Sequence, residues 1–210
     1  MVHLLHIDSS PRGARSHSRR LSREFVEAWK QSHPTGSVSY RDLGHNPPPH
    51  VDEAWIAAAF TSPEQRTSQM WEAIEISDRL VDEFLTADVY VIGIPMYNFT
   101  VPSTLKAYID QIVRVGRTWL FEPEDAEMPY KTLVHNKKMF VITARGDGGY
   151  DSGGRNEKLN HQDPYIKTVF AFMGITDLHF IHVENDEFGG KKLADSITNA
   201  RTRITELVAA

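Results

Sequence analysis

Residues 87–102 read ADVYVIGIPMYNFTVP, and they carry the clearest indication of the fold in the 210-residue chain. Its first half, residues 87–94, is almost continuously apolar, which is typical of a strand buried on both faces of a parallel sheet. Beyond it, apolar residues recur at i, i+4, i+7 and i+8 from Leu105, which is the spacing of an amphipathic helix. A buried strand that leads directly into a helix is the repeating unit of parallel α/β sheets.

On either side of this stretch, four more strand signals alternate with helical ones. The strands are expected at residues 2–7, 38–42, 87–94, 139–143 and 178–183. The helices are expected at residues 18–29, 62–85, 105–113, 163–173 and 193–207. A capping box at Ser62 and Gln65 is expected to begin the second helix, and Asp163 with Pro164 to cap the fourth. The pattern predicts one α/β domain over residues 1–210, a doubly wound sheet of five parallel strands with helices on both faces.

The composition excludes several classes of function. Lys and Arg number 23 and Asp and Glu number 28, so the net charge of −5 does not favour a nucleic-acid partner. Cysteine is absent, which excludes disulfides, thiolate metal sites and a thiol nucleophile, so any redox chemistry must be carried by a bound group. We expect a cytoplasmic protein without a membrane segment, because the longest apolar run is too short to cross a bilayer. No cluster of His, Asp and Glu has the spacing of metal ligands.

In open parallel sheets, ligands bind beyond the carboxyl ends of the strands, so the loops after the first, third and fourth strands are the candidate site. The first of them, residues 9–18, reads SSPRGARSHS and leads into a helix. Free backbone N–H groups at a helix N-terminus favour a phosphate, and hydroxyl and guanidinium groups add donors. The candidate donors are Ser10, Ser16, Ser18 and either Arg12 or Arg15, within a segment from Ser9 to Arg23 that holds five arginines and no acid. Alternatively, these serines only cap the helix.

The other two loops have unusual compositions. Residues 95–102 combine aromatic and thioether side chains with an amide, which suits a flat heterocycle with a polar edge. The alternative is that Met96, Tyr97 and Phe99 belong to the core and Asn98 to a turn. The third loop, residues 146–154, is rich in glycine, which allows close backbone approach to a ligand and equally suits a mobile surface loop.

Taken together, these residues resemble the FMN-dependent NADH:quinone oxidoreductase and azoreductase family. The resemblance covers essentially the whole chain in order. It rests on Ser9-Ser10 with Ser16 and Ser18, on residues 95–102, on Arg145-Gly146 and on residues 172–177. It implies a flavodoxin-like fold, FMN bound without a covalent link, and a homodimer with two active sites at its interface. It also implies transfer of two electrons from NADH or NADPH to quinone or azo acceptors by a ping-pong mechanism.

The resemblance also implies roles for individual residues. The implied FMN contacts are Ser10, Ser16, His17, Ser18, Met96, Tyr97, Asn98, Phe99, Ala144, Arg145, Gly146 and Asp147. The implied acceptor pocket includes Phe172, and Leu120 with Phe121 from the other subunit. The family usually reads Ser-Arg-Gly-Gly at residues 144–147, so Ala144 and Asp147 depart from its pattern. The long segment 122–136 is expected to shape the pocket.

The chemistry implied by the resemblance is carried by the flavin, so no catalytic acid or base is assigned. His161 is the one histidine that we would test as a proton donor, whereas His3, His6, His179 and His182 fall in expected strands and are interpreted as structural. Two other functions stay open. One is a flavodoxin-type electron carrier. The other is a phosphoester-binding protein that uses residues 9–18, which we call the serine loop, without a flavin.

Overall fold

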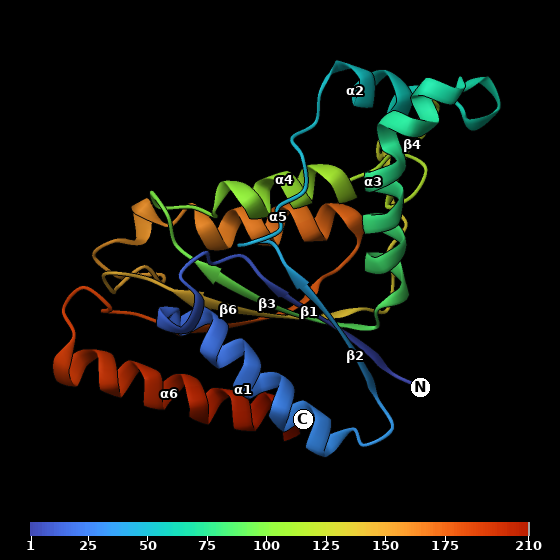
Figure 1. Cartoon of the computed structure of the whole chain (residues 1–210). Coiled ribbons are helices and arrows are strands. Elements are labelled where there is room, and N and C mark those ends of the chain that lie inside the picture. The colour runs from blue at the N-terminus through green and yellow to red at the C-terminus, as the bar shows by residue number, and fades with distance from the viewer. Residues whose placement is uncertain (210) are drawn as a thin grey trace.

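Five parallel strands form one sheet at the centre of the structure, a computed structural model that describes residues 1–209 (Figure 1). Their order is β2-β1-β3-β6-β7, so the chain crosses the sheet in both directions from β1. The strands are β1 (His3–Asp8), β2 (Ser37–Asp42), β3 (Val89–Pro95), β6 (Lys138–Ala144) and β7 (Asp177–Val183). This confirms the prediction of a doubly wound sheet with five parallel strands.

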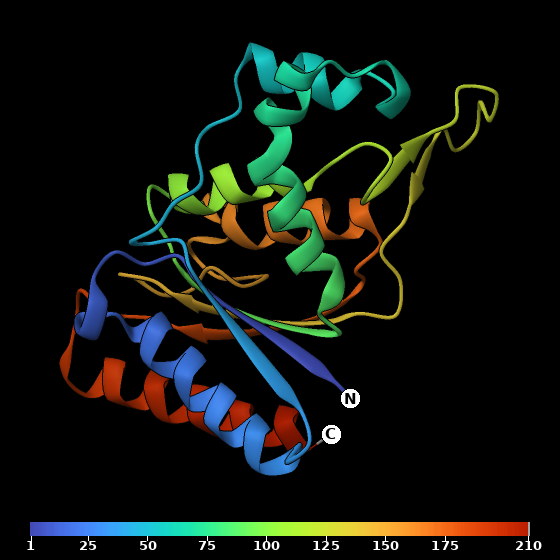
Figure 2. The same cartoon turned by 45° about the vertical axis from the view of Figure 1, so that its right-hand side comes forward.

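Helices cover both faces of the sheet, as Figures 1 and 2 show. One face carries α1 (His17–Ser32) and α6 (Gly190–Ala209). The other face carries α3 (Ser68–Thr86), α4 (Ser103–Ile112) and α5 (Gln162–Met173). Strand β3 contributes Ile92 to the core on the second face and Val91 to the core on the first. The nearly continuous apolar run of β3 is therefore explained by burial on both faces.

The segment between β2 and α3 differs from the prediction. Residues 53–60, for which no element was expected, form α2 (Glu53–Phe60), and the carboxylate of Asp52 caps it by accepting from the N–H of Trp55 at 2.9 Å. The capping box at Ser62 was a wrong prediction, because Pro63–Gln65 form only a short 3₁₀ turn, η2. Helix α3 begins later, where the hydroxyl of Thr67 accepts from the N–H of Met70 at 3.3 Å. The reason is that Arg66 is extended, with φ −70° and ψ 131°, and separates the turn from the helix.

A small antiparallel hairpin was also not predicted. It consists of β4 (Trp119–Phe121) and β5 (Tyr130–Thr132), and it projects from the body of the molecule at the upper right of Figure 2. Its strands have three residues each, which is too short for an alternating pattern to be recognised. Trp119 and Tyr130 of the hairpin pack with Phe172 of α5, and Phe121 packs with Tyr130; we call these four residues the aromatic cluster.

The start of α5 corrects another expectation. Asp163 does not cap this helix; instead the side-chain oxygen of Asn160 accepts from the N–H groups of Gln162 and Asp163, at 3.2 and 3.1 Å. The carboxylate of Asp163 turns inward and pairs with Arg145. The short 3₁₀ segments η1 (Gly13–Arg15) and η3 (Glu157–Leu159) complete the secondary structure of the described residues.

Within residues 1–209, no helix is both long enough and apolar enough to cross a membrane.

Candidate functional site

The loops that follow β1, β3, β6 and β7 meet at the carboxyl edge of the sheet and enclose a cavity of about 410 Å³. This volume lies within the range of roughly 300–1,000 Å³ that is typical of sites for small molecules. The lining residues are Ser10, Arg12, Ser16, His17, Pro95, Met96, Tyr97, Ala144, Arg145, Gly146, Asp186 and Glu187. Eight of the twelve implied cofactor contacts therefore line one cavity.

The end of this cavity next to α1 provides unpaired hydrogen-bond donors. Ser16 caps α1, because its hydroxyl accepts from the N–H of Arg19 at 3.3 Å. The N–H groups of His17 and Ser18, in the first turn, donate to no other group within residues 1–209. The serine loop can therefore cap the helix and bind a phosphate at the same time, because the cap leaves the N–H groups of the first turn free. This donor set and the positive end of the helix dipole suit a phosphate dianion.

Of the five arginines between residues 9 and 23, only Arg19 is buried, and its charge is used inside the protein. The buried Arg19 donates from Nε to the carbonyl oxygen of Ser10 at 2.6 Å and pairs with Asp42. Burial alone would lower the pKa of the Arg19 guanidinium, but the hydrogen bond to Asp42 and the nearby groups of Asp8, Tyr40 and Asp42 together outweigh it, and the pKa is raised. Of the two arginines predicted to face a phosphate, Arg12 lines the cavity and Arg15 does not. Arg19 instead holds the backbone of the loop in place.

Asp186, in the loop after β7, bridges two residues of the serine loop across the cavity. Its Oδ2 accepts from Nη1 of Arg12 at 3.0 Å, and its Oδ1 lies 3.0 Å from Nε2 of His17. Because Arg20 donates to Nδ1 of His17 at 2.9 Å, Nε2 carries the proton and donates to Asp186. Burial raises the pKa of the Asp186 carboxyl, but the hydrogen bonds and the charge interactions with Arg12 and His17 together outweigh it, and the pKa lies below its ordinary value. We call this arrangement the Asp186 bridge.

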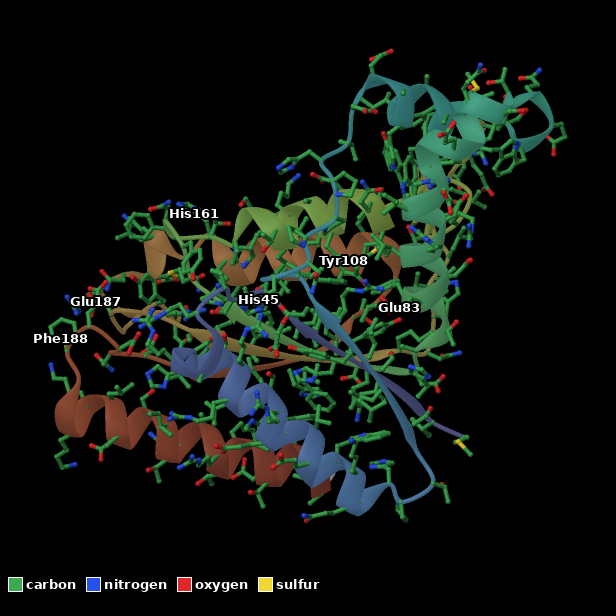
Figure 3. All side chains as sticks on the ribbon, in the orientation of Figure 1. His45, Glu83, Tyr108, His161, Glu187 and Phe188 are labelled. Atoms are coloured by element: carbon green, nitrogen blue, oxygen red, sulfur yellow. The ribbon has the colours of Figure 1, made fainter. Side chains whose placement is uncertain are left out.

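Asp186 and its neighbour Glu187 were missed by the reasoning from sequence. Both line the cavity, and Figure 3 shows Glu187 at the same edge of the molecule as Phe188. The signal that could have found them is topological, since they follow the fifth parallel strand and the carboxyl ends of all five strands share one edge.

The loop after β3 forms a tight turn beside the cavity. The N–H of Tyr97 donates to the carbonyl of Thr100 at 3.0 Å, and the reverse bond measures 3.1 Å. Asn98 and Phe99 have φ values of 48° and 68°, a left-handed conformation that residues other than glycine adopt at a cost. Met96 and Tyr97 line the cavity, whereas Asn98 lines a neighbouring cavity of about 460 Å³ that shares Tyr97. Strained backbone of this kind is concentrated at functional sites.

Arg145 forms part of the cavity wall, but its guanidinium group points away from the cavity. Its guanidinium is fully buried and donates from Nη2 to Asp163 at 2.6 Å and from Nε to the side-chain oxygen of Gln162 at 3.3 Å. Nη1 lies 3.5 Å from Oε1 of Glu184, and the group stacks over the ring of Tyr150. This side chain positions the loop rather than contacting a ligand in the cavity.

The glycine-rich loop is ordered by Asp147. The carboxylate accepts from the N–H of Gly148 at 2.7 Å and from Nδ2 of Asn156 at 3.0 Å, and it pairs with Arg155. These bonds, the one from Gly148 above all, hold the pKa of Asp147 below its ordinary value. Asp147 is absent from the cavity wall. The carboxylate that stands here, where the family usually has glycine, therefore stabilises the loop internally.

The three residues that the resemblance places in the acceptor pocket lie outside this cavity. Leu120 and Phe121 belong to the hairpin, and Phe172 lies in the last turn of α5 and is not part of the cavity wall. The rings of Trp119 and Phe172 are 5.3 Å apart, so these residues contact one another and not the cavity of their own chain. His161 lies at the start of α5 with an exposed side chain (Figure 3), and its N–H donates to the carbonyl of Phe99 at 3.1 Å.

Comparison with known proteins identifies the family. A family model described as a flavodoxin-like fold matches residues 2–208. The FMN-dependent NADH:quinone oxidoreductase of Nostoc punctiforme is 52% identical over 209 residues, covering 100% of this chain and 99% of the relative. The FMN-dependent NAD(P)H:quinone oxidoreductase 1 of Pseudomonas aeruginosa is 42% identical, over 99% of this chain and 98% of the relative. The crystal structure of an azoreductase from Bacillus anthracis matches with a TM-score of 0.88 and 26% identity, over 99% of both chains. The chain therefore belongs to the family of FMN-dependent NADH:quinone oxidoreductases, with a flavodoxin-like fold.

Proposed function

We propose that this chain binds FMN without a covalent link in the cavity at the carboxyl edge and reduces quinone or azo compounds with electrons from NADH or NADPH. The observation that carries the proposal is the donor set at the N-terminus of α1, where the N–H groups of His17 and Ser18 are free beside the hydroxyl of Ser10. A phosphate fits this end of the cavity, and the turn after β3 offers apolar and aromatic side chains for a ring system. The names of the relatives support the same activity.

Residues at the two ends of the cavity are proposed to bind different parts of FMN. The proposed contacts with FMN are Ser10, Ser16, His17 and Ser18 at the phosphate, and residues 96–99 and 144–147 at the ring. The N–H groups of Asn98, Phe99, Gly146 and Asp147 donate to no other group within residues 1–209, so they are available to the polar edge of a ring. Such donors stabilise negative charge that develops at this edge. Bound FMN supplies the hydride and electron transfer itself.

The position of the aromatic cluster supports a homodimer. Phe121 and Tyr130 are 51% and 54% exposed and lie next to each other on the projecting hairpin, and a contiguous exposed apolar patch marks an interaction site. In the proposed dimer, Leu120, Phe121 and Phe172 of one subunit complete the acceptor pocket of the other. The nicotinamide donor and the acceptor then use this pocket in turn, which gives ping-pong kinetics, and the enzyme works in the cytoplasm.

The test of the proposed function is anaerobic mixing of the FMN-loaded protein with NADH or NADPH. We expect the flavin absorbance to bleach on mixing and to return when a quinone is added. If neither nucleotide bleaches the flavin, the chain is an electron carrier and not a reductase. If FMN leaves the melting temperature unchanged, the flavin-free alternative is correct, since a ligand stabilises the state it binds by mass action.

The Asp186 bridge gives a prediction about cofactor retention. In Asp186→Asn, the amide has one acceptor oxygen and cannot hold both Arg12 and His17, so the serine loop loses its tie to the loop after β7. We expect FMN to dissociate about tenfold faster, equivalent to ~1.4 kcal/mol. The return of FMN fluorescence after dilution measures the rate. Asp195→Asn, which affects only an exposed pair with Lys191 on α6, is the control. Slower release in Asp186→Asn would mean that the carboxylate competes with the phosphate, contrary to the prediction.

A further inference from the structure

A second cavity, of about 380 Å³, lies at the corner of the molecule where α2, α3 and the segment after α4 meet. It shares no lining residue with the proposed FMN cavity. In Figure 1 this corner is at the upper right, whereas the arrowhead of β3 points to the left. The lining residues are Ala59, Phe60, Thr61, Ser62, Pro63, Arg66, Trp71, Asp78, Arg114, Val115, Gly116 and Arg117.

Two of the three arginines in this wall have nitrogens without a hydrogen-bond partner within residues 1–209. Arg114 is only 1% exposed; it donates from Nη1 to Ser77 at 2.7 Å and pairs with Asp78, but its buried Nε has no partner within residues 1–209. Arg66 donates from Nε to the carbonyl oxygens of Ala58 and Thr61, at 2.9 and 3.0 Å. The two terminal nitrogens of Arg66 have no hydrogen-bond partner in the described part of the chain.

The cavity wall also has an excess of positive charge. Three guanidinium groups face one lining carboxylate, Asp78, which is shared between Arg114 at 3.2 Å and Arg117 at 3.4 Å. The exposed Asp82, outside the wall, pairs with Arg117 as well. Burial lowers the pKa of the Arg114 guanidinium, Asp78 opposes this, and the nearby charges of Arg66 and Arg117 lower it further. An anion in the cavity would offset this repulsion between like charges.

We propose that this cavity binds a phosphate monoester attached to a planar ring. Guanidinium groups recognise phosphate through paired, charge-assisted hydrogen bonds, which suits the two free terminal nitrogens of Arg66. Trp71 and Phe60, 43% and 66% exposed, provide the apolar part of the wall. The guanidinium carbon of Arg66 lies 4.8 Å from the centre of the Trp71 ring, so a charged and an aromatic contact are available side by side.

Calorimetric titration of the protein loaded with one FMN per chain and freed of excess FMN tests the proposal, because FMN then fills the phosphate end of the other cavity and none is left to compete for this one. The probes are inorganic phosphate, AMP and adenosine at constant ionic strength. We expect phosphate to bind, AMP to bind more tightly, and adenosine to give no heat of binding. In the double variant Arg66→Gln/Arg117→Gln, affinity for AMP should fall by about tenfold or more, since two of three cationic donors are lost.

The control variants locate the site. Arg79→Gln removes an exposed arginine from the same helix, α3, and Arg12→Gln removes the cation of the FMN cavity; both should bind AMP as the unmodified protein does. Arg114 is left unchanged because its burial makes misfolding the expected result of replacing it. Thermal melting must show that the double variant is folded. The proposal is overturned if phosphate and AMP do not bind, if adenosine binds as tightly as AMP, or if Arg12→Gln and not the double variant abolishes binding.

Discussion

Replacement of Arg145 by methionine is expected to lower the free energy of unfolding by about 3–5 kcal/mol, the usual cost of removing one partner from a buried ion pair. The guanidinium is the shared partner of Asp163 and Glu184, and the first of these carboxylates is almost completely buried. Without it, two negative charges remain close together and poorly solvated. The loop from residue 144 to 147 also loses its attachment to α5, so FMN affinity should fall with stability.

Urea unfolding at neutral pH measures the first effect. The matched control is Arg155→Met. Arg155 follows the same strand, its side chain is largely exposed, and it pairs with Asp147. Exposed ion pairs contribute about 0–1 kcal/mol, so the control should remain close to the unmodified protein. Equal losses in the two variants would contradict the view that burial of Arg145 makes its ion pairs important.

Replacement of Gly93 by alanine is expected to cost about 1–3 kcal/mol, as is typical of overpacking in a filled core. A Cβ atom at this position in β3 would overlap the carboxylate of Asp8 and lie 3.2 Å from the carbonyl of Ser18 and from the hydroxyl of Ser22. Asp8 cannot move aside easily, because it is buried and accepts a hydrogen bond from Ser22 at 2.8 Å. The first turn of α1 must therefore shift away from the sheet.

This shift connects packing with cofactor binding, since the same turn carries the free N–H groups proposed to bind the phosphate. We expect FMN affinity to fall by about tenfold, or ~1.4 kcal/mol, in Gly93→Ala. Fluorescence titration measures the affinity, and the urea midpoint measures the stability. Gly146→Ala is the control for stability, because the three atoms nearest to its new Cβ all belong to the flexible side chain of Glu187. The interpretation fails if the two alanine variants have the same midpoint.

The sheet could be predicted because each of its strands has a strong local pattern. In β3, burial on both faces requires apolar residues at successive positions, and this requirement is visible without any knowledge of the neighbouring strands. Helix α2 could not be predicted in this way, since residues 54–60 are almost entirely apolar and give no amphipathic stripe. Its cap, Asp52, was the one local signal available.

The candidate site could be predicted only where its chemistry is local. The serine loop and the turn after β3 are contiguous in sequence, so their donors and rings could be recognised as groups. The direction of Arg145 could not be predicted, because an arginine in a loop has the same local sequence whether it contacts a ligand or a buried carboxylate. Asp186 comes from a distant loop that only the topology brings beside Arg12.

The separation of the aromatic cluster from the cavity of its own chain has a consequence for how this family can diversify. The cavity is built from loops at the ends of sheet strands, while the hairpin is a short insertion between α4 and β6 that forms no part of the five-stranded sheet. Under the proposed function, cofactor retention and acceptor choice are encoded in different segments. Exchange of residues 119–132 between relatives is then a modular route to new acceptor ranges that leaves the flavin pocket intact.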